Sequence, residues 1–245
     1  MPYALISVLI VSSISLIGVF TFAVKQEKLK KILFILVSFS AGALLGGAVF
    51  HLIPEAVEEI GFGKKMGFSF LGGIVVFFIL EKFIRWRHCH VPTSDQHPHA
   101  FGYMNLVGDA FHNFIDGMII AASYLISIPL GIATTWAVVF HEIPQEISDF
   151  GVLLYAGFSK GRALLLNFLT AFFAIFGCLV TFLLSRFIEN FSLLLVPFAA
   201  AGFVYIAGSD LIPELHRETN FKKSLIQLFF LVLGIFLMFF LGFLE

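Results

Sequence analysis

Two apolar segments of the chain carry polar side chains of the types that bind cations. The first, from about residue 103 to 126, contains Asn105, Asp109, His112, Asn113 and Asp116. The second, from about residue 130 to 156, contains His141, Glu142, Gln145, Glu146 and Asp149. In a helix, the 4, 7 and 11 residue offsets from Asn105 to Asp109, His112 and Asp116 place these side chains on one face. His141 and Gln145 likewise stack one turn apart, beside a stripe formed by the three acids of the second segment.

The residue types of these two stripes indicate a divalent metal ion. A carboxylate in the middle of a membrane costs about 2.5–3.5 kcal/mol, so five acids need a cation or an inward-facing polar site. Imidazole, carboxylate and amide groups without a thiolate suit zinc, iron(II), manganese or cadmium and argue against copper(I). A satisfied core histidine or a closed structural zinc site are the alternatives. Because there are more candidate ligands than one structural ion needs, and two are weak amides, the pattern favours an ion that binds and leaves again.

The composition indicates a membrane protein. The 245 residues are 59% hydrophobic and only 13% charged, whereas soluble domains carry about 25% charged residues. Apolar runs of 18 or more residues recur along the whole chain, so we expect a single transmembrane domain, residues 1–245, with the lipid bilayer as its surroundings. The formal net charge of −1 and the absence of a basic cluster give no indication of nucleic-acid binding.

The hydrophobic pattern predicts an all-α fold with eight membrane spans. Their approximate ranges are 3–24, 33–54, 66–84, 103–126, 130–156, 163–186, 192–213 and 223–243. Twelve of the 15 Lys and Arg residues follow spans one, three, five and seven. Because such residues concentrate in cytoplasmic loops, both termini are expected outside the cytoplasm. No targeting feature is apparent, which favours the plasma (inner) membrane of a prokaryote.

Two similar helix endings indicate an inverted repeat. The sequence His51-Leu-Ile-Pro-Glu55 closes span two, and Asp210-Leu-Ile-Pro-Glu214 closes span seven, which runs in the opposite direction. We therefore expect spans 1–3 and 6–8 to be related, with spans four and five between them, a common transporter architecture. In this arrangement His51 and Glu55 would lie at the outer mouth, and Asp210 and Glu214 at the inner mouth. The alternative is that these are only solvated helix ends.

Prolines within the spans should free backbone carbonyl groups. Pro144 has no N–H, so the carbonyl of Phe140, four residues earlier, loses its partner within the helix. This carbonyl could serve as an extra oxygen ligand or mark a bending point.

The connection after span three contains four histidines, His88, His90, His97 and His99. Several imidazoles in a short polar segment could capture a metal ion transiently on the cytoplasmic side. A polar linker with scattered histidines is an equally acceptable interpretation.

The motifs Phe111-His-Asn-Phe-Ile-Asp-Gly117 and His141-Glu-Ile-Pro-Gln-Glu146 resemble helices four and five of the ZIP (Zrt/Irt-like) metal transporters. The resemblance implies a 3+2+3 helix bundle, often dimeric, that brings divalent metals into the cytoplasm by moving its metal-bearing helices. Zinc is the usual substrate, iron, manganese and cadmium are alternatives, and no cofactor is implied. It also implies a one- or two-metal centre with the ligands His112, Asn113, Asp116, His141, Glu142, Gln145 and Glu146.

The resemblance extends to the pathway and contains one departure. Asn167 in span six matches a polar residue that often joins the family's metal centre, and Asp109 and Asp149 are expected along the pathway. Gln145 stands where the subgroup closest in pattern has a second histidine. Because an amide is a weaker transition-metal ligand than imidazole, the preference for zinc is open.

A membrane-embedded metal-dependent hydrolase is the alternative function. His141-Glu142 begins like the His-Glu-x-x-His motif of zinc proteases. The fifth position is Gln145, and Pro144 interrupts the helix that this motif needs, so we expect a transporter and not an enzyme.

Overall fold

The computed structural model describes residues 2–22, 26–86, 100–188 and 190–242, and all regular structure within these ranges is helical. The expected all-α fold is thus confirmed. His88, His90, His97 and His99 lie outside the described residues, so metal capture by their segment stays a prediction.

The described chain forms eight helical segments, several of them composed of consecutive elements. In chain order they are α1 (Pro2–Ile14) with the 3₁₀ helix η1 (Ser15–Phe22); α2 (Gln26–Gly47) with the π-helical turn η2 (Ala48–Leu52) and α3 (Ile53–Ile60); α4 (Lys64–Trp86); α5 (Ala100–Ile126); α6 (Ile128–Tyr155); α7 (Lys160–Ala171) with α8 (Phe173–Leu184); α9 (Phe191–Ile206) with the π-helical turn η3 (Ala207–Leu211) and α10 (Ile212–Leu215); and α11 (Phe221–Leu241).

Five segments of the described chain are long and apolar enough to cross a membrane by length and composition: Pro2–Val19, Lys31–Ile60, Lys160–Leu184, Phe191–Leu215 and Phe221–Leu241. Helices α5 and α6 are equally long but carry the polar stripes predicted from the sequence. The chain is therefore a multi-pass membrane protein whose middle helices hold a polar interior.

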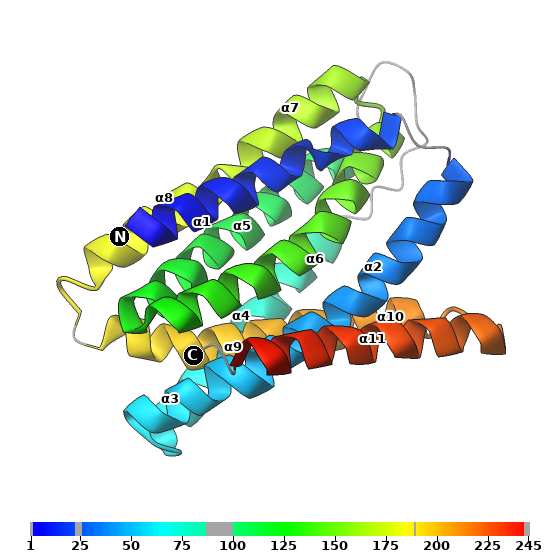
Figure 1. The fold of residues 1–245 in the computed structure, drawn as a ribbon. Helices are drawn as coiled ribbons and strands as arrows, with labels where there is room; N and C mark the ends of the chain where they lie inside the picture. The colour runs from blue at the N-terminus through cyan, green and yellow to red at the C-terminus, as the bar shows by residue number, and fades with distance from the viewer. Residues whose placement is uncertain (1, 23–25, 87–99, 189, 243–245) are drawn as a thin grey trace.

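The helices form two groups (Figure 1). The first helix group consists of α1, α5, α6, α7 and α8, and its most extensive packing joins α5 to α8 and to α6. The second helix group consists of α2, α3, α4, α9, α10 and α11, in which the most extensive packing joins α11 to α2 and α9 to α4. The groups meet mainly where α2 packs on α6 and α9 on α5.

Within the first group, α5 and α8 approach each other at two glycines. A Cβ atom on Gly117 would lie 1.8 Å from the carbonyl oxygen of Ala174, and one on Gly177 would lie 1.9 Å from that of Phe114. Small residues allow such close helix contact in membranes, where packing takes the place of the hydrophobic effect. This crossing sets the position of α5 at Asp116, the neighbour of Gly117.

The second group contains an equivalent crossing between α2 and α11. A Cβ atom on Gly42 would lie 1.9 Å from the carbonyl oxygen of Leu231, and one on Gly234 would lie 2.2 Å from that of Phe39. Each group therefore contains a helix pair whose close approach depends on glycine.

Helix α6 continues through Pro144 without interruption. The carbonyl of Phe140, which Pro144 deprives of its helical partner, accepts a hydrogen bond from the hydroxyl group of Ser40 on α2. The carbonyl that Pro144 deprives of its helical partner therefore has a donor from the other helix group, and its role as an extra ligand stays a prediction.

The two Leu-Ile-Pro-Glu endings have the same local structure. A π-helical turn precedes each of them, η2 before Pro54 and η3 before Pro213, and each proline lies in the first turn of the short helix that follows. A proline is tolerated there because its missing N–H needs no partner. This shared irregularity agrees with an inverted repeat, which stays a prediction.

Candidate metal centre

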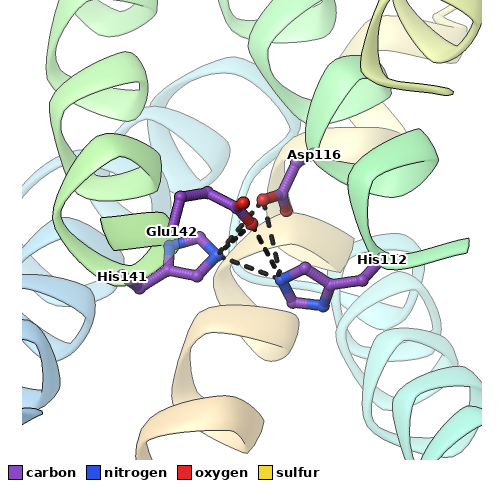
Figure 2. A group of neighbouring side chains, drawn as sticks. All are labelled: His112, Asp116, His141 and Glu142. Carbon is purple, nitrogen blue, oxygen red and sulfur yellow. Dashed lines mark hydrogen bonds and ion pairs between the residues drawn. The ribbon is translucent and has the colours of Figure 1, made fainter. Parts of the chain in front are cut away.

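Four side chains converge between α5 and α6. His112 and Asp116 lie one turn apart on α5, and His141 and Glu142 are consecutive on α6. Figure 2 shows the four side chains pointing toward one another from the two helices. One potential ligand atom from each lies within 4.8 Å of all the others.

The contacts among these four residues are short and involve ring nitrogens and carboxylate oxygens. The Nε2 atoms of His112 and His141 are 3.1 Å apart. His141 Nε2 lies 3.1 Å from Asp116 Oδ2 and 3.6 Å from Glu142 Oε1. His112 Nε2 lies 3.7 Å and 3.5 Å from the same two oxygens.

A backbone contact orients the ring of His141. Its Nδ1 atom lies 3.1 Å from the carbonyl oxygen of Ala137, one turn earlier on α6. Because a carbonyl only accepts, Nδ1 carries the proton and donates, which leaves the lone pair of Nε2 directed at Asp116. This is the orientation in which a histidine binds a metal ion while its other nitrogen is held by a neighbour.

The two carboxylates of the centre lack hydrogen-bond donors. Both oxygens of Asp116 and both of Glu142 are buried and accept no hydrogen bond. The side chains of Asp116, His141 and Glu142 are at most 1% exposed, and that of His112 is 15% exposed. Buried carboxylates that face an imidazole lone pair are strongly unfavourable unless a cation lies between them.

A second set of buried oxygens lies on α5, α6 and α7. Among the described residues, no hydrogen-bond donor reaches the side-chain oxygens Asn113 Oδ1, Glu146 Oε1 and Asn167 Oδ1, and the same holds for both oxygens of Glu142. All four residues are 0% exposed. Asn167 donates through its Nδ2 atom to Glu146 Oε2, so α7 contacts α6 at this point. This set contains only oxygen ligands, unlike the histidine-containing centre.

A cavity of about 560 Å³ adjoins the centre. His112, His141, Asp109 and Gln145 line it, and it extends to Asn105 and Asp149, then to Glu81 and Glu214. Asn105 lies near the start of α5, whereas Asp149, Glu81 and Glu214 lie near the ends of α6, α4 and α10, respectively. The cavity thus connects the metal centre with one end of the helix bundle.

The two predicted pathway acids near the centre have specific partners. Asp109 accepts hydrogen bonds from Asn113 Nδ2 at 2.8 Å and from the hydroxyl group of Thr170 on α7. Asp149 accepts one from Asn105 Nδ2 at 3.1 Å. Thr170 is not among the predicted site residues, although it lies three residues after Asn167 and so on the same side of α7.

None of the four predicted mouth residues is among the four converging ligands. His51 is 2% exposed, and its Nε2 atom lies 2.7 Å from the carbonyl oxygen of Met238 on α11. Neither His51 nor Glu55 is among the described residues that line the cavity. Glu214 lines the cavity and lies 2.7 Å from Arg217. Asp210 is in η3, and its side chain is not among those described.

The chain matches known metal transporters over nearly its whole length. A family model described as "ZIP Zinc transporter" matches residues 1–102 and 88–242. Zinc transporter zipt-7.1 of Caenorhabditis briggsae is 30% identical over 86% of this chain and 71% of its own length. Zinc transporter ZIP13 of Pongo abelii is 33% identical over 83% of this chain and 65% of its own length. Zinc transporter YKE4 of Saccharomyces cerevisiae is 31% identical over 86% of this chain and 71% of its own length.

These relatives are named as transporters, so they give no support to the hydrolase alternative. The matches to the family model and to these proteins agree with the multi-pass helical fold and with the four converging ligands on α5 and α6. The chain belongs to the ZIP family of metal transporters.

Proposed function

We propose that this chain carries divalent transition-metal ions, zinc foremost, into the cytoplasm through the centre between α5 and α6. The observation that carries this proposal is the convergence of His112, Asp116, His141 and Glu142, with ligand atoms within 4.8 Å of one another and carboxylates that lack donors. The spacing of these atoms supports zinc. A tetrahedral ion with bonds of about 2.0–2.1 Å holds its ligands about 3.3–3.4 Å apart. The observed separations involving the two Nε2 atoms run from 3.1 to 3.7 Å.

The oxygen-only set provides a second ion position. Asn113, Glu146 and Asn167 would bind an ion there through their unpartnered oxygens, and Glu142 would take part in both positions through its two oxygens. Carboxylate and carbonyl ligands suit harder ions such as manganese, whereas imidazole suits zinc and cadmium. A centre with both sets explains how one pathway accepts iron or manganese beside zinc.

Gln145 is the remaining member of the expected ligand set. It lines the cavity next to the centre. As an amide it binds zinc weakly, so we propose that it contacts the ion during passage and sets selectivity.

The cavity supports release toward the cytoplasm. With the orientation derived from the Lys and Arg distribution, its far end at Glu81 and Glu214 faces the cytoplasm. The ion would leave past Asn105 and Asp149, whose oxygen atoms can replace water around it.

The division into helix groups supports movement of the first group against the second. The candidate ligands of both positions lie on α5, α6 and α7, all in the first group. The second group contributes aromatic rings: Phe77 is 6.5 Å from His112, and Phe203 is 6.0 Å from His141, between ring centroids. At these two points the contact between the groups is apolar, so movement there breaks no hydrogen bond to either histidine ring.

The outer part of the pathway and the assembly complete the proposal. His51 and Glu55 would receive the ion at the outer mouth and Asp210 would act at the inner one, in a plasma-membrane homodimer with both termini outside the cytoplasm. These features rest on the sequence pattern and the family resemblance.

Uptake into proteoliposomes that contain the purified chain tests the proposal. Saturable zinc influx is expected for the unmodified chain, and none for His112→Ala at equal amounts of inserted protein. Phe111→Ala is the matched control, since Phe111 is the adjacent residue on α5 and is 53% exposed. Normal influx in His112→Ala, or metal binding without any influx in the unmodified chain, would contradict the proposal.

A further inference from the structure

The Asp109 side chain is buried and has both of its oxygens occupied. It is 4% exposed and lies one turn before Asn113 on α5. Its Oδ1 accepts a hydrogen bond from Asn113 Nδ2 at 2.8 Å, and its Oδ2 accepts one from the Thr170 hydroxyl group. Asp109 therefore differs from Asp116 and Glu142, whose oxygens have no donors.

The contact with Asp109 determines the orientation of the Asn113 amide. Asn113 Nδ2 lies 2.8 Å from Asp109 Oδ1 and 3.1 Å from the backbone oxygen of Asp109. Rotating the amide by half a turn would place its oxygen against these two acceptors, which is repulsive. The amide nitrogen is thus held by Asp109, and the amide oxygen is left buried and without a donor.

The same arrangement occurs at Asn167. Its Nδ2 atom donates to Glu146 Oε2, and its Oδ1 atom is buried without a donor. In both pairs a carboxylate accepts a hydrogen bond from the amide nitrogen, and the amide oxygen is left without a donor. The pairs differ in the carboxylate, because Glu146 keeps one oxygen without a donor whereas Asp109 keeps none.

We propose that Asp109 is a positioning residue that holds the Asn113 amide with its oxygen toward the metal ion, and that Thr170 anchors Asp109 from α7. This inference rests on the proposed second ion position and changes the pathway role expected for Asp109 from the sequence. Asp109 does not bind the ion but makes Asn113 able to bind it. Residues that orient a metal ligand typically change affinity by about 10- to 100-fold when they are removed.

Two substitutions of Asp109 separate positioning from direct binding. In Asp109→Asn, the new amide oxygen can still accept from Asn113 while its nitrogen donates to the Thr170 hydroxyl group, so the Asn113 orientation is kept. In Asp109→Leu, the side-chain acceptor is lost and only the backbone oxygen of residue 109, 3.1 Å from Asn113 Nδ2, is left to hold the amide. If Asp109 bound the ion directly, Asp109→Asn would also weaken Mn²⁺ binding, because a neutral amide oxygen is a weaker ligand than a carboxylate.

The experiment measures equilibrium binding of Mn²⁺ and Cd²⁺ to the purified full chain. Asp109→Leu is expected to weaken Mn²⁺ binding about 10- to 100-fold, while Cd²⁺ binding at the histidine-containing centre changes little. Asp109→Asn should keep Mn²⁺ affinity within about threefold, since it keeps the hydrogen bond. Thr170→Val removes the hydroxyl group and should weaken Mn²⁺ binding, whereas Thr170→Ser keeps the hydroxyl group and should bind Mn²⁺ as the unmodified chain does. This pair tests the anchor even if Asp109→Leu does not fold.

Thr134→Val is the matched control. Thr134 lies on α6, is 2% exposed and donates a hydrogen bond of 3.0 Å to Ser123. Thr134→Val therefore loses a buried hydroxyl contact, as Thr170→Val does, but at a residue outside the metal centre. Its Mn²⁺ affinity should be unchanged. Adding Asp109→Leu to Asn113→Ala should cause no further loss, because Asp109 acts through Asn113.

The outcomes separate the inference from the proposed function. Equal losses in Asp109→Asn and Asp109→Leu, a further loss in the Asn113→Ala background, or equal losses of Mn²⁺ and Cd²⁺ would each overturn the positioning role. If neither ion binds to the unmodified chain, the proposed metal centre itself fails, together with the inference.

Discussion

Ser40 on α2 donates a hydrogen bond to the carbonyl oxygen of Phe140 on α6, the residue directly before the candidate ligand His141. Pro144 cannot bond to this carbonyl, so the contact supplies its missing partner from the other helix group. The bond therefore couples the metal-bearing helix to the second helix group at the level of the centre.

Replacing Ser40 with Ala should leave the Phe140 carbonyl without a donor and destabilise the protein by about 1–2 kcal/mol. Thermal unfolding in detergent measures this change. Ser38→Ala is the control, since Ser38 is also buried but bonds to the Phe34 carbonyl of its own helix at 2.9 Å. Equal decreases in unfolding temperature in the two variants would mean that the hydrogen bond between the helix groups stabilises the protein no more than one within a helix.

Replacing Gln145 with His should shift selectivity toward zinc. Gln145 lines the cavity beside His141, and imidazole is a much stronger ligand for zinc than an amide. Competition between Zn²⁺ and Mn²⁺ during uptake into proteoliposomes measures the effect, with Gln145→Asn as the control that keeps an amide. An unchanged Zn²⁺ to Mn²⁺ ratio in the histidine variant would show that Gln145 does not contact the ion.

Glu142 should be required for both proposed ion positions, because neither of its two buried oxygens has a hydrogen-bond donor among the described residues. Glu142→Gln is expected to abolish binding of Cd²⁺ and Mn²⁺ together. His112→Ala should weaken Cd²⁺ more than Mn²⁺, and Asn167→Ala should do the reverse. Metal content per purified chain measures all three, and parallel losses in His112→Ala and Asn167→Ala would indicate a single ion position.

The crossing of α5 and α8 should not tolerate a side chain at Gly177. A Cβ atom there would lie 1.9 Å from the carbonyl oxygen of Phe114, so Gly177→Ala forces the helices apart at a cost of about 1–3 kcal/mol. Gly72→Ala on α4 is the control, because a Cβ atom at Gly72 has no neighbour within 4 Å. A lower unfolding temperature is expected for Gly177→Ala alone, and equal temperatures would contradict the close crossing.

Much of the centre could be predicted because its ligands are close together in the sequence. His112 and Asp116 are one turn apart, His141 and Glu142 are consecutive, and helical periodicity alone indicates which of these side chains share a face. The same local rule predicted that Pro144 would free the carbonyl of Phe140. The apolar runs of 18 or more residues likewise indicated membrane helices, since a helix bonds all its backbone groups within its own segment.

Tertiary structure alone decided which helix faces meet. The contacts of Ser40 with Phe140, Thr170 with Asp109, and Asn167 with Glu146 each join helices that are separate in the sequence. The Nε2 atom of His51 lies 2.7 Å from the Met238 carbonyl oxygen of α11, a partner that no local sequence pattern predicts. Periodicity orders side chains around one helix, whereas the rotation and approach of neighbouring helices depend on close packing such as that at Gly117 and Gly177.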